Sequence, residues 1–168
     1  NGLLDEVTAL VEWPITLKGS FNPEFLRLPK EVLITSMQSH QKCFAMENKQ
    51  QQLLPHFLLV SNIESPTPEI IIQGNERVIN ARLSDAMFFY NNDLQKTLYN
   101  RTKQLDHVIF QEKLGTLKDK VSRLSKLITS LSKHTTADAA ITKRAAQLCK
   151  CDLVSEMVVE FPSLQGIM

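Results

Sequence analysis

The pattern of hydrophobic and polar positions divides the chain into two parts of different character. The first hundred residues mix short apolar runs with helical stripes, whereas the apolar residues beyond them recur mainly at spacings of three and four. Short apolar runs favour strands, and the second spacing is that of one helix face. We therefore expect an α+β fold, with a mixed helix and strand portion carrying a small antiparallel sheet over residues 1–92 and an all-helical portion over residues 93–168.

The first portion combines short helices and strands. Helices are expected at 3–11, before Pro14, and from Pro29 to His40, because proline disfavours helix in the residue before it but is tolerated at a helix start. The apolar runs 43–46 and 57–60 read as paired strands. A further strand is expected at 15–17, and a turn from Gly19 to Pro23.

An amphipathic helix is predicted after Gly74, which itself would close a brief helix over 67–72 while Asn75 caps the next one. Its apolar stripe comprises Ile79, Leu83, Ala86, Met87 and Tyr90. Arg77, Arg82 and Asp85 fall away from this stripe. Arginines five residues apart lie about 140° from each other on a helix, so an ion pair and a phosphate contact both remain open for each.

The second portion reads as nearly all helix. Leu94, Leu98 and Leu105 are expected to share a face, and Thr116 with Asp119 forms an acidic variant of the capping box before a long stripe. That stripe comprises Leu114, Leu117, Val121, Leu124, Ile128 and Leu131, with Lys118, Lys120, Arg123 and Lys126 on its polar side. A third helix is expected from Asp138, with Ile141, Ala145, Leu148 and Cys149 pointing inward. Asp152 continues this inward line and must either accept hydrogen bonds or have a function.

Charge is distributed unevenly although the net charge is only +1. Residues 1–100 contain eight Lys and Arg against eleven Asp and Glu, whereas residues 101–168 contain eleven against seven. All eleven of those basic residues lie within 101–150. This excess is consistent with a polyanion-binding surface and equally with a solvated, lysine-rich helix surface.

Signatures of catalysis and metal binding are absent from the sequence. It contains no dinucleotide-binding glycine motif, P-loop, nucleophile elbow or paired zinc ligands, and its four histidines are scattered. The three cysteines are expected to be reduced. With no apolar run near the ~18 residues of a membrane span, we expect a cytoplasmic protein, and the lack of an initiator methionine suggests a piece excised from a longer chain.

Several motifs, in order along the whole chain, resemble the beta subunit of bacterial heterotetrameric glycyl-tRNA synthetase. They are Leu10-Val11-Glu12-Trp13-Pro14, Gln41-Lys42-Cys43-Phe44, Gly74-Asn75-Glu76-Arg77-Val78 with Ala81-Arg82-Leu83 and Phe88-Phe89, Phe110-Gln111 with Leu114-Gly115-Thr116, and Lys150-Cys151-Asp152-Leu153 through Leu164-Gln165-Gly166. Cys43 is a departure, because family members often carry tyrosine there.

The resemblance implies a division of labour between subunits. In this family the alpha subunit holds the catalytic site for ATP and glycine, and the beta subunit supplies tRNA binding and is needed for assembly of two alpha and two beta chains. The chain itself would then be catalytically inactive and bind no cofactor or metal, with ATP and magnesium at the alpha subunit. Its partners would be that subunit and tRNA(Gly).

The resemblance further implies that the helical portion is an incomplete module similar to HD-domain phosphohydrolases. Cys149-Lys150 stands where such enzymes carry the adjacent His-Asp pair, and a lysine cannot replace a carboxylate as metal ligand. The fold without the metal chemistry is therefore expected, and a metal-dependent HD-type phosphohydrolase is the least favoured alternative.

Two sets of residues follow from these hypotheses. The leading hypothesis, tRNA binding by the basic helices, assigns Arg101, Lys103, Lys118, Lys120, Arg123, Lys126, Lys143, Arg144 and Lys150 to the nucleic acid. The alternative, a protein interaction module, rests on adjacent bulky aromatics that cannot both enter one core from a helix. It assigns Arg77, Arg82, Phe88 and Phe89 to a subunit or tRNA interface.

Overall fold

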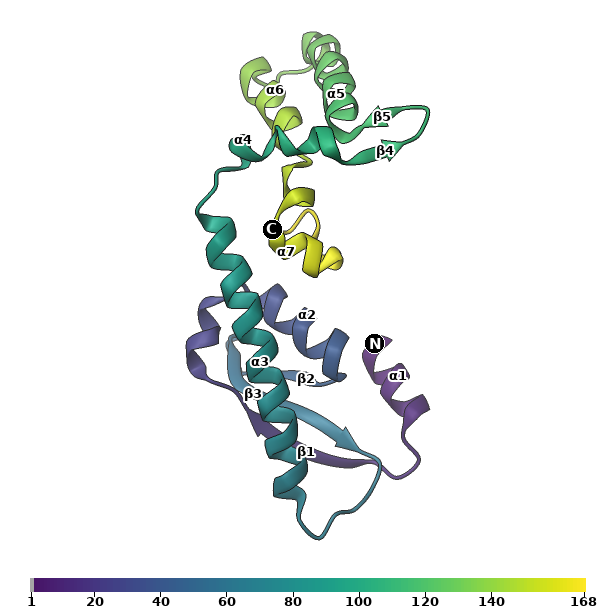
Figure 1. Cartoon of the computed structure of the whole chain (residues 1–168), viewed down its shortest axis with the longest axis vertical. Coiled ribbons are helices and arrows are strands. Elements are labelled where there is room, and N and C mark those ends of the chain that lie inside the picture. Colours follow the sequence, from purple (N-terminus) through teal and green to yellow (C-terminus); the bar gives the residue numbers. More distant parts are fainter. Residues whose placement is uncertain (1) are drawn as a thin grey trace. The chain divides into compact units, whose positions relative to one another are not determined.

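The computed structural model describes residues 2–168, apart from the side chain of Lys133, and divides into two compact units that meet between Phe89 and Tyr90. The long helix α3 (Pro68–Leu94) belongs mostly to the first unit, and its last turn belongs to the second (Figure 1). The division falls slightly before the boundary expected at residue 92.

The first unit is a three-stranded antiparallel sheet with helices packed against it (Figure 1). Strand β3 (Leu53–Ser61) lies between β1 (Ile15–Ser20) and β2 (Phe44–Glu47), with Leu17 opposite Leu59 and Phe44 opposite Leu58. The remaining elements are α1 (Gly2–Leu10), η1 (Pro23–Arg27) and α2 (Lys30–Gln41). The predicted pairing of residues 43–46 with 57–60 is confirmed.

Side chains of β3 and its neighbours form the core of this unit. Phe57 is fully buried, and Gly19, opposite it on β1, leaves room for its ring, since an added Cβ would lie 2.3 Å from the ring carbon Cζ. The turn predicted from Gly19 to Pro23 was therefore misplaced, because Gly19 and Ser20 belong to β1. A glycine that reads as a turn signal in sequence here accommodates a cross-strand aromatic ring.

Helix α3 is continuous, which corrects the prediction of a brief helix closed by Gly74. Gly74 does not adopt a positive φ, so it ends no helix. The Asn75 side chain donates to the Ile71 carbonyl at 2.9 Å within the helix instead of capping a new one. The predicted stripe is nevertheless correct, with Ile79, Leu83 and Ala86 buried.

Two polar residues of α3 attach it to the end of β1. Glu76 Oε1 accepts from the Ser20 backbone N–H and hydroxyl at 2.8 and 2.7 Å, and Asn80 Oδ1 accepts from the Asn22 N–H at 2.9 Å. These hydrogen bonds satisfy backbone donors where the strand ends. Glu76, part of the Gly74–Val78 motif, therefore has a structural role.

The second unit is mainly helical but contains a small hairpin, so the prediction of an all-helical portion was wrong. Strands β4 (Ile109–Gln111) and β5 (Gly115–Thr116) pair antiparallel, with Gly115 at φ +80°. The other elements are α4 (Leu98–Arg101), η2 (Gln104–His107), α5 (Leu117–Leu131), η3 (Ser132–His134), α6 (Ala139–Leu148), η4 (Cys151–Val154), α7 (Glu156–Glu160) and η5 (Pro162–Leu164). The relationship of this unit to HD-domain folds stays a prediction.

A compact core joins η2, α5 and η4. It comprises Leu105, Leu117, Val121 and Cys151, surrounded by partly buried Val108, Leu148, Leu153 and Val154. The inward face predicted for α6 was right for Leu148, which packs against this core, but wrong for Ile141, Ala145 and Cys149, which are exposed; Ala146 is the buried residue of this helix. Leu94 and Leu98 are also exposed, since the chain leaves the helix between them.

One carboxylate connects the beginning and the end of the second unit. Asp93 Oδ1 lies 2.6 Å from Arg101 Nη2, and these side chains are only 13% and 6% exposed. The same carboxylate accepts from the backbone N–H groups of Glu156 and Met157 at 3.0 and 2.8 Å, at the start of α7. Asp93 thus pairs a buried charge and satisfies the free donors of a helix N-terminus at once.

No helix within residues 2–168 combines the length and apolar character needed to cross a membrane.

Candidate nucleic-acid interface

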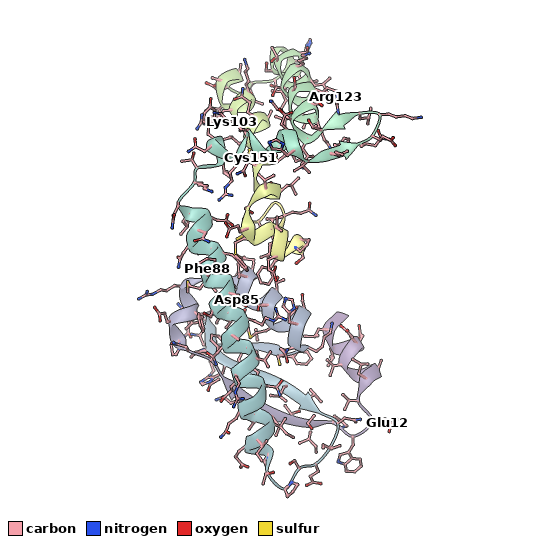
Figure 2. All side chains as sticks on the ribbon, in the orientation of Figure 1. Glu12, Asp85, Phe88, Lys103, Arg123 and Cys151 are labelled. Carbon is pink, nitrogen blue, oxygen red and sulfur yellow. The ribbon has the colours of Figure 1, made fainter. Side chains whose placement is uncertain are left out.

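The basic residues assigned to a nucleic acid are distributed over α4, η2, α5 and α6 of the second unit. All but three of them are exposed: Lys120 and Lys150 are partly buried and Arg101 is buried. Figure 2 shows Lys103 on the segment between α4 and η2 and Arg123 on α5.

Arg101 does not fit the surface role predicted for it. Its side chain is 6% exposed, and its guanidinium bonds the Asp93 carboxylate, the Asp93 carbonyl and the Val154 carbonyl. A buried arginine whose donors are occupied stabilises the unit and is not accessible to a phosphate. The sequence signal failed because Asp93 lies eight residues away, beyond the reach of a helical pairing rule.

A cavity of about 250 Å³ brings two of the predicted lysines together. Lys103 and Lys118 line it with Tyr99, and the Thr102 hydroxyl and the Gln147 amide add polar groups. Leu105 and Val121 supply its apolar lining. An aromatic ring beside lysines is the combination on which an unpaired base stacks while its phosphate meets a cation.

Three of the basic side chains on α5 are held in place by neighbouring groups. Lys118 Nζ bonds Asp106 Oδ2 at 2.6 Å, Lys120 Nζ lies 3.7 Å from the centre of the Phe110 ring, and Arg123 Nη1 donates to the Leu114 carbonyl at 2.9 Å. The aromatic ring and the carbonyl orient their cations without neutralising them, whereas Asp106 offsets the charge of Lys118.

The N-terminus of α5 carries the predicted capping box. The Asp119 N–H donates to the Thr116 hydroxyl at 3.2 Å, and Asp119 Oδ2 accepts from the Thr116 N–H at 2.8 Å. The Thr116 backbone hydrogen bond, followed by the hydroxyl hydrogen bond, lowers the pKa of Asp119 below its usual range. Because the carboxylate occupies this helix start, we assign no phosphate site to it.

Three assigned lysines and one arginine make no ion pair or hydrogen bond within the described residues. These are Lys103, Lys126, Lys143 and Arg144, all of which are exposed. Their side-chain charges are free for an external partner, and together with Lys120 and Arg123 they make up six of the twelve basic residues of this unit.

The residues assigned to an interface lie on α3 of the first unit. Arg77 and Arg82 are exposed, and within the described residues neither pairs with Asp85. Phe88 is 62% exposed and its ring contacts that of the half-buried Phe89 edge-on, with centroids 5.8 Å apart. Figure 2 shows Asp85 and Phe88 on this helix. The expectation that the two rings would not enter one core together is consistent with these exposures.

Asp152 accepts a hydrogen bond, which is the first of the two alternatives open for it. It is 9% exposed, and its Oδ2 accepts from the Gly166 N–H at 2.7 Å. The donor lies in a later turn, while Asp93 and Ser155 cap the start of α7. Beside it, Cys151 is buried, and burial followed by the neighbouring Asp152 charge raises the pKa of its thiol.

Within residues 2–168, no three histidine, cysteine, aspartate or glutamate side chains gather in an arrangement that could hold a metal ion.

Sequence reasoning missed the non-basic members of the candidate site. Gln147 is distant from the lysines in sequence and meets them only because α6 packs against α5, whereas Tyr99 lies four residues before Lys103. The one available signal was an aromatic residue next to a basic segment, Tyr99 followed by Arg101 and Lys103.

Comparison with known proteins identifies the family. The family model described as glycyl-tRNA synthetase beta subunit matches residues 1–168. The chain is 59% identical over 168 residues to the glycine–tRNA ligase beta subunit of Coxiella burnetii (strain RSA 493 / Nine Mile phase I), covering all of this chain and 24% of that protein. It is 52% identical over 166 residues to the corresponding subunit of Chromohalobacter salexigens and 52% over 165 residues to that of Acinetobacter baylyi, covering 99% and 98% of this chain and 24% of each relative. The chain thus spans about a quarter of the length of these curated relatives, and it belongs to the glycyl-tRNA synthetase beta subunit family.

Proposed function

We propose that the chain supplies a tRNA-binding surface and part of the subunit scaffold of a glycyl-tRNA synthetase. The family match supports this setting, since a protein named as the beta subunit of a glycine–tRNA ligase implies an alpha partner and a tRNA substrate. In the proposed enzyme, two alpha and two beta chains assemble in the cytoplasm, and the alpha subunit binds ATP and magnesium and attaches glycine to tRNA(Gly). The present chain contributes binding and no catalytic group.

The observation that carries the tRNA proposal is the cavity beside Tyr99. Its ring is 60% exposed and offers a stacking surface, Lys103 offers an unpaired cation, and the Gln147 amide can exchange hydrogen bonds with a base edge. Lys126, Lys143 and Arg144 extend the positive field over α5 and α6. We assign an unpaired nucleotide to the cavity. The sugar-phosphate backbone on either side of that nucleotide is assigned to Lys126, Lys143 and Arg144.

The test compares two charge-matched triple variants of the full-length beta chain assembled with its alpha subunit. Lys103, Lys126 and Lys143 are replaced by alanine in one, and Lys18, Lys30 and Lys49 of the first unit in the other. All six lysines are exposed and make no contact within the described residues that the substitutions would break.

Each lost phosphate contact reduces the slope of log affinity against log salt by about 0.7 to 0.9. The variant in the second unit removes three such contacts, so the magnitude of its slope for tRNA(Gly) binding should fall by about 2 to 3. The control variant should keep the wild-type slope. Equal slopes in both variants would exclude this surface. Tyr99→Ala should weaken binding by 1–3 kcal/mol through lost stacking, with the salt slope unchanged.

A second candidate function, protein–protein interaction within the synthetase, is favoured by the exposure of Phe88. A large aromatic side chain that is 62% exposed is an anchor of the kind that dominates interface energies. If the alpha subunit is the partner that contacts Phe88, Phe88→Ala should shift sedimentation of the alpha and beta mixture toward free subunits. Unchanged assembly would remove the alpha subunit as the partner of this residue.

A further inference from the structure

Helix α3 exposes two large apolar side chains on the side opposite its buried stripe. Ile79 is 2% exposed, whereas Ile70 and Phe88 are 68% and 62% exposed. Both exposed residues are nine positions from Ile79, which places them about 180° around the helix from the buried stripe. On a surface helix this side is expected to be the most polar.

The exposed side follows the spacing of a helix–helix contact. The residues on this side are separated by alternating steps of four and three, at positions 70, 74, 77, 81, 84 and 88. This is the spacing of the residues through which one helix packs along another. We call this set the outer seam; it comprises Ile70, Gly74, Arg77, Ala81, Ser84 and Phe88, all exposed. It extends over about 27 Å at the α-helical rise.

Gly74 has no explanation within the first unit. An added Cβ would meet nothing within 4 Å, and the residue does not need a positive φ. Glycine in a helix interior destabilises the helix relative to alanine. The remaining physical reason for glycine here is the close approach of another backbone, which Ala81 and Ser84 on the same seam would also permit.

Arg77 indicates the chemistry of the element that covers the seam. It lies between Gly74 and Ala81 on the seam and makes no ion pair within the described residues. An arginine covered by a partner without a counter-charge would be strongly destabilising. The facing element therefore carries a carboxylate opposite Arg77.

We propose that the outer seam is covered by an α-helix from the part of the same beta polypeptide that lies outside residues 1–168, with a carboxylate facing Arg77. The chain spans 24% of the length of its relatives, so about three quarters of the polypeptide is available to fold onto it. A segment of the same chain meets the seam at a high effective concentration, whereas a separate subunit must first lose translational freedom. The proposal extends the scaffolding role and does not depend on tRNA binding.

Thiol labelling of full-length beta chains tests this occupant. Ser84→Cys places a thiol on the seam, and Ser39→Cys, an exposed position on α2 of the same unit, is the control. Labelling by N-ethylmaleimide is followed by mass spectrometry of the peptide carrying each position, and each rate is divided by the rate in guanidinium chloride. In beta alone, without alpha or tRNA, position 84 should be protected at least about ten-fold more than position 39.

Equal protection at the two positions would overturn the proposal. Protection that appears only after alpha or tRNA is added would overturn it as well, because the occupant would then be that partner. Since the assay contains no tRNA, failure of the tRNA proposal leaves this result unaffected.

A second pair of variants tests the close approach. Gly74→Leu, combined with Ser84→Cys, should raise labelling at position 84 at least about five-fold by separating the helices. Glu69→Leu, also combined with Ser84→Cys, adds the same side chain at an exposed position about 100° around the helix from the middle of the seam and should leave labelling unchanged. No difference between the two leucine variants would refute a helix seated at Gly74.

Discussion

Replacing Asp93 by alanine should destabilise the second unit more than almost any other single change of charge in the chain. The substitution leaves Arg101, which is 6% exposed, without its counter-ion and removes the acceptor for two N–H groups of α7. Breaking a buried ion pair by removing one partner costs about 3–5 kcal/mol. A unit of this size has a total stability of roughly 4–12 kcal/mol at 0.05–0.15 kcal/mol per residue, so the substitution should remove between about a quarter and all of that stability.

An exposed pair of the same length provides the control. Lys118 and Asp106 approach to 2.6 Å, as Asp93 and Arg101 do, but their side chains are 56% and 50% exposed. Exposed ion pairs contribute about 0–1 kcal/mol because water and salt screen them. Asp106→Ala should therefore cost no more than this amount, and the contrast isolates burial from distance.

Hydrogen exchange during a urea titration measures the two units separately. Amides of α5 report on the second unit, and amides of β3 report on the first. Asp93→Ala should lower the opening free energy of α5 by about 3–5 kcal/mol and leave β3 unchanged. A loss in α5 no larger than that of Asp106→Ala would refute the reasoning.

A double variant addresses the mechanism. Asp93→Asn keeps a side-chain oxygen for the α7 donors, and Arg101→Met removes the buried charge. Because Arg101→Met leaves no uncompensated cation, the double variant should cost less than the sum of the two single changes. Additive costs would indicate that the two side chains do not act as a pair.

Three further predictions concern single residues. Thr116→Ala should reduce the stability of the second unit by about 1 kcal/mol in urea denaturation through loss of the α5 cap. The pKa of Asp119 is lowered in the folded state. The contribution of this carboxylate to stability is therefore present above the unfolded pKa of about 3.9 and disappears as the pH falls through the lower folded pKa. Gly19→Ala should cost about 1–3 kcal/mol by overpacking the first unit, and a neutral effect on its thermal midpoint would contradict the 2.3 Å contact described for its Cβ. Ellman's reagent at pH 8 should modify exposed Cys149 in the native chain but not Cys43, since burial raises the pKa of that thiol to about 11; rapid reaction of both would show that the core opens.

The local elements could largely be predicted from the sequence because their determinants are local. The stripe around Ile79 and Leu83 repeats at helical spacing, and Thr116 with Asp119 spells out a helix start. Glycine was the main source of error. Gly19 and Gly74 both read as breaks, but one accommodates an aromatic ring and the other lies inside a continuous helix.

The candidate site was less predictable because its members meet only after packing. Charge counting found Lys103 and Lys118, since an excess of bases is visible in any sequence. It could not separate them from Arg101, whose burial depends on a backbone fold that brings Asp93 and Val154 around it. Nor could it find Gln147, which meets the lysines only because α6 packs against α5.

The carboxylate of Asp93 also sets an order of events during synthesis of the chain. Its hydrogen-bond partner Met157 lies 64 residues later, so at about 5–20 residues per second the ribosome needs roughly 3 to 13 seconds to deliver it. The first unit is complete in sequence at Phe89, before Asp93 has been added. The nascent chain therefore passes through a stage in which the sheet unit is folded while the basic unit that follows it still lacks the partner that closes it.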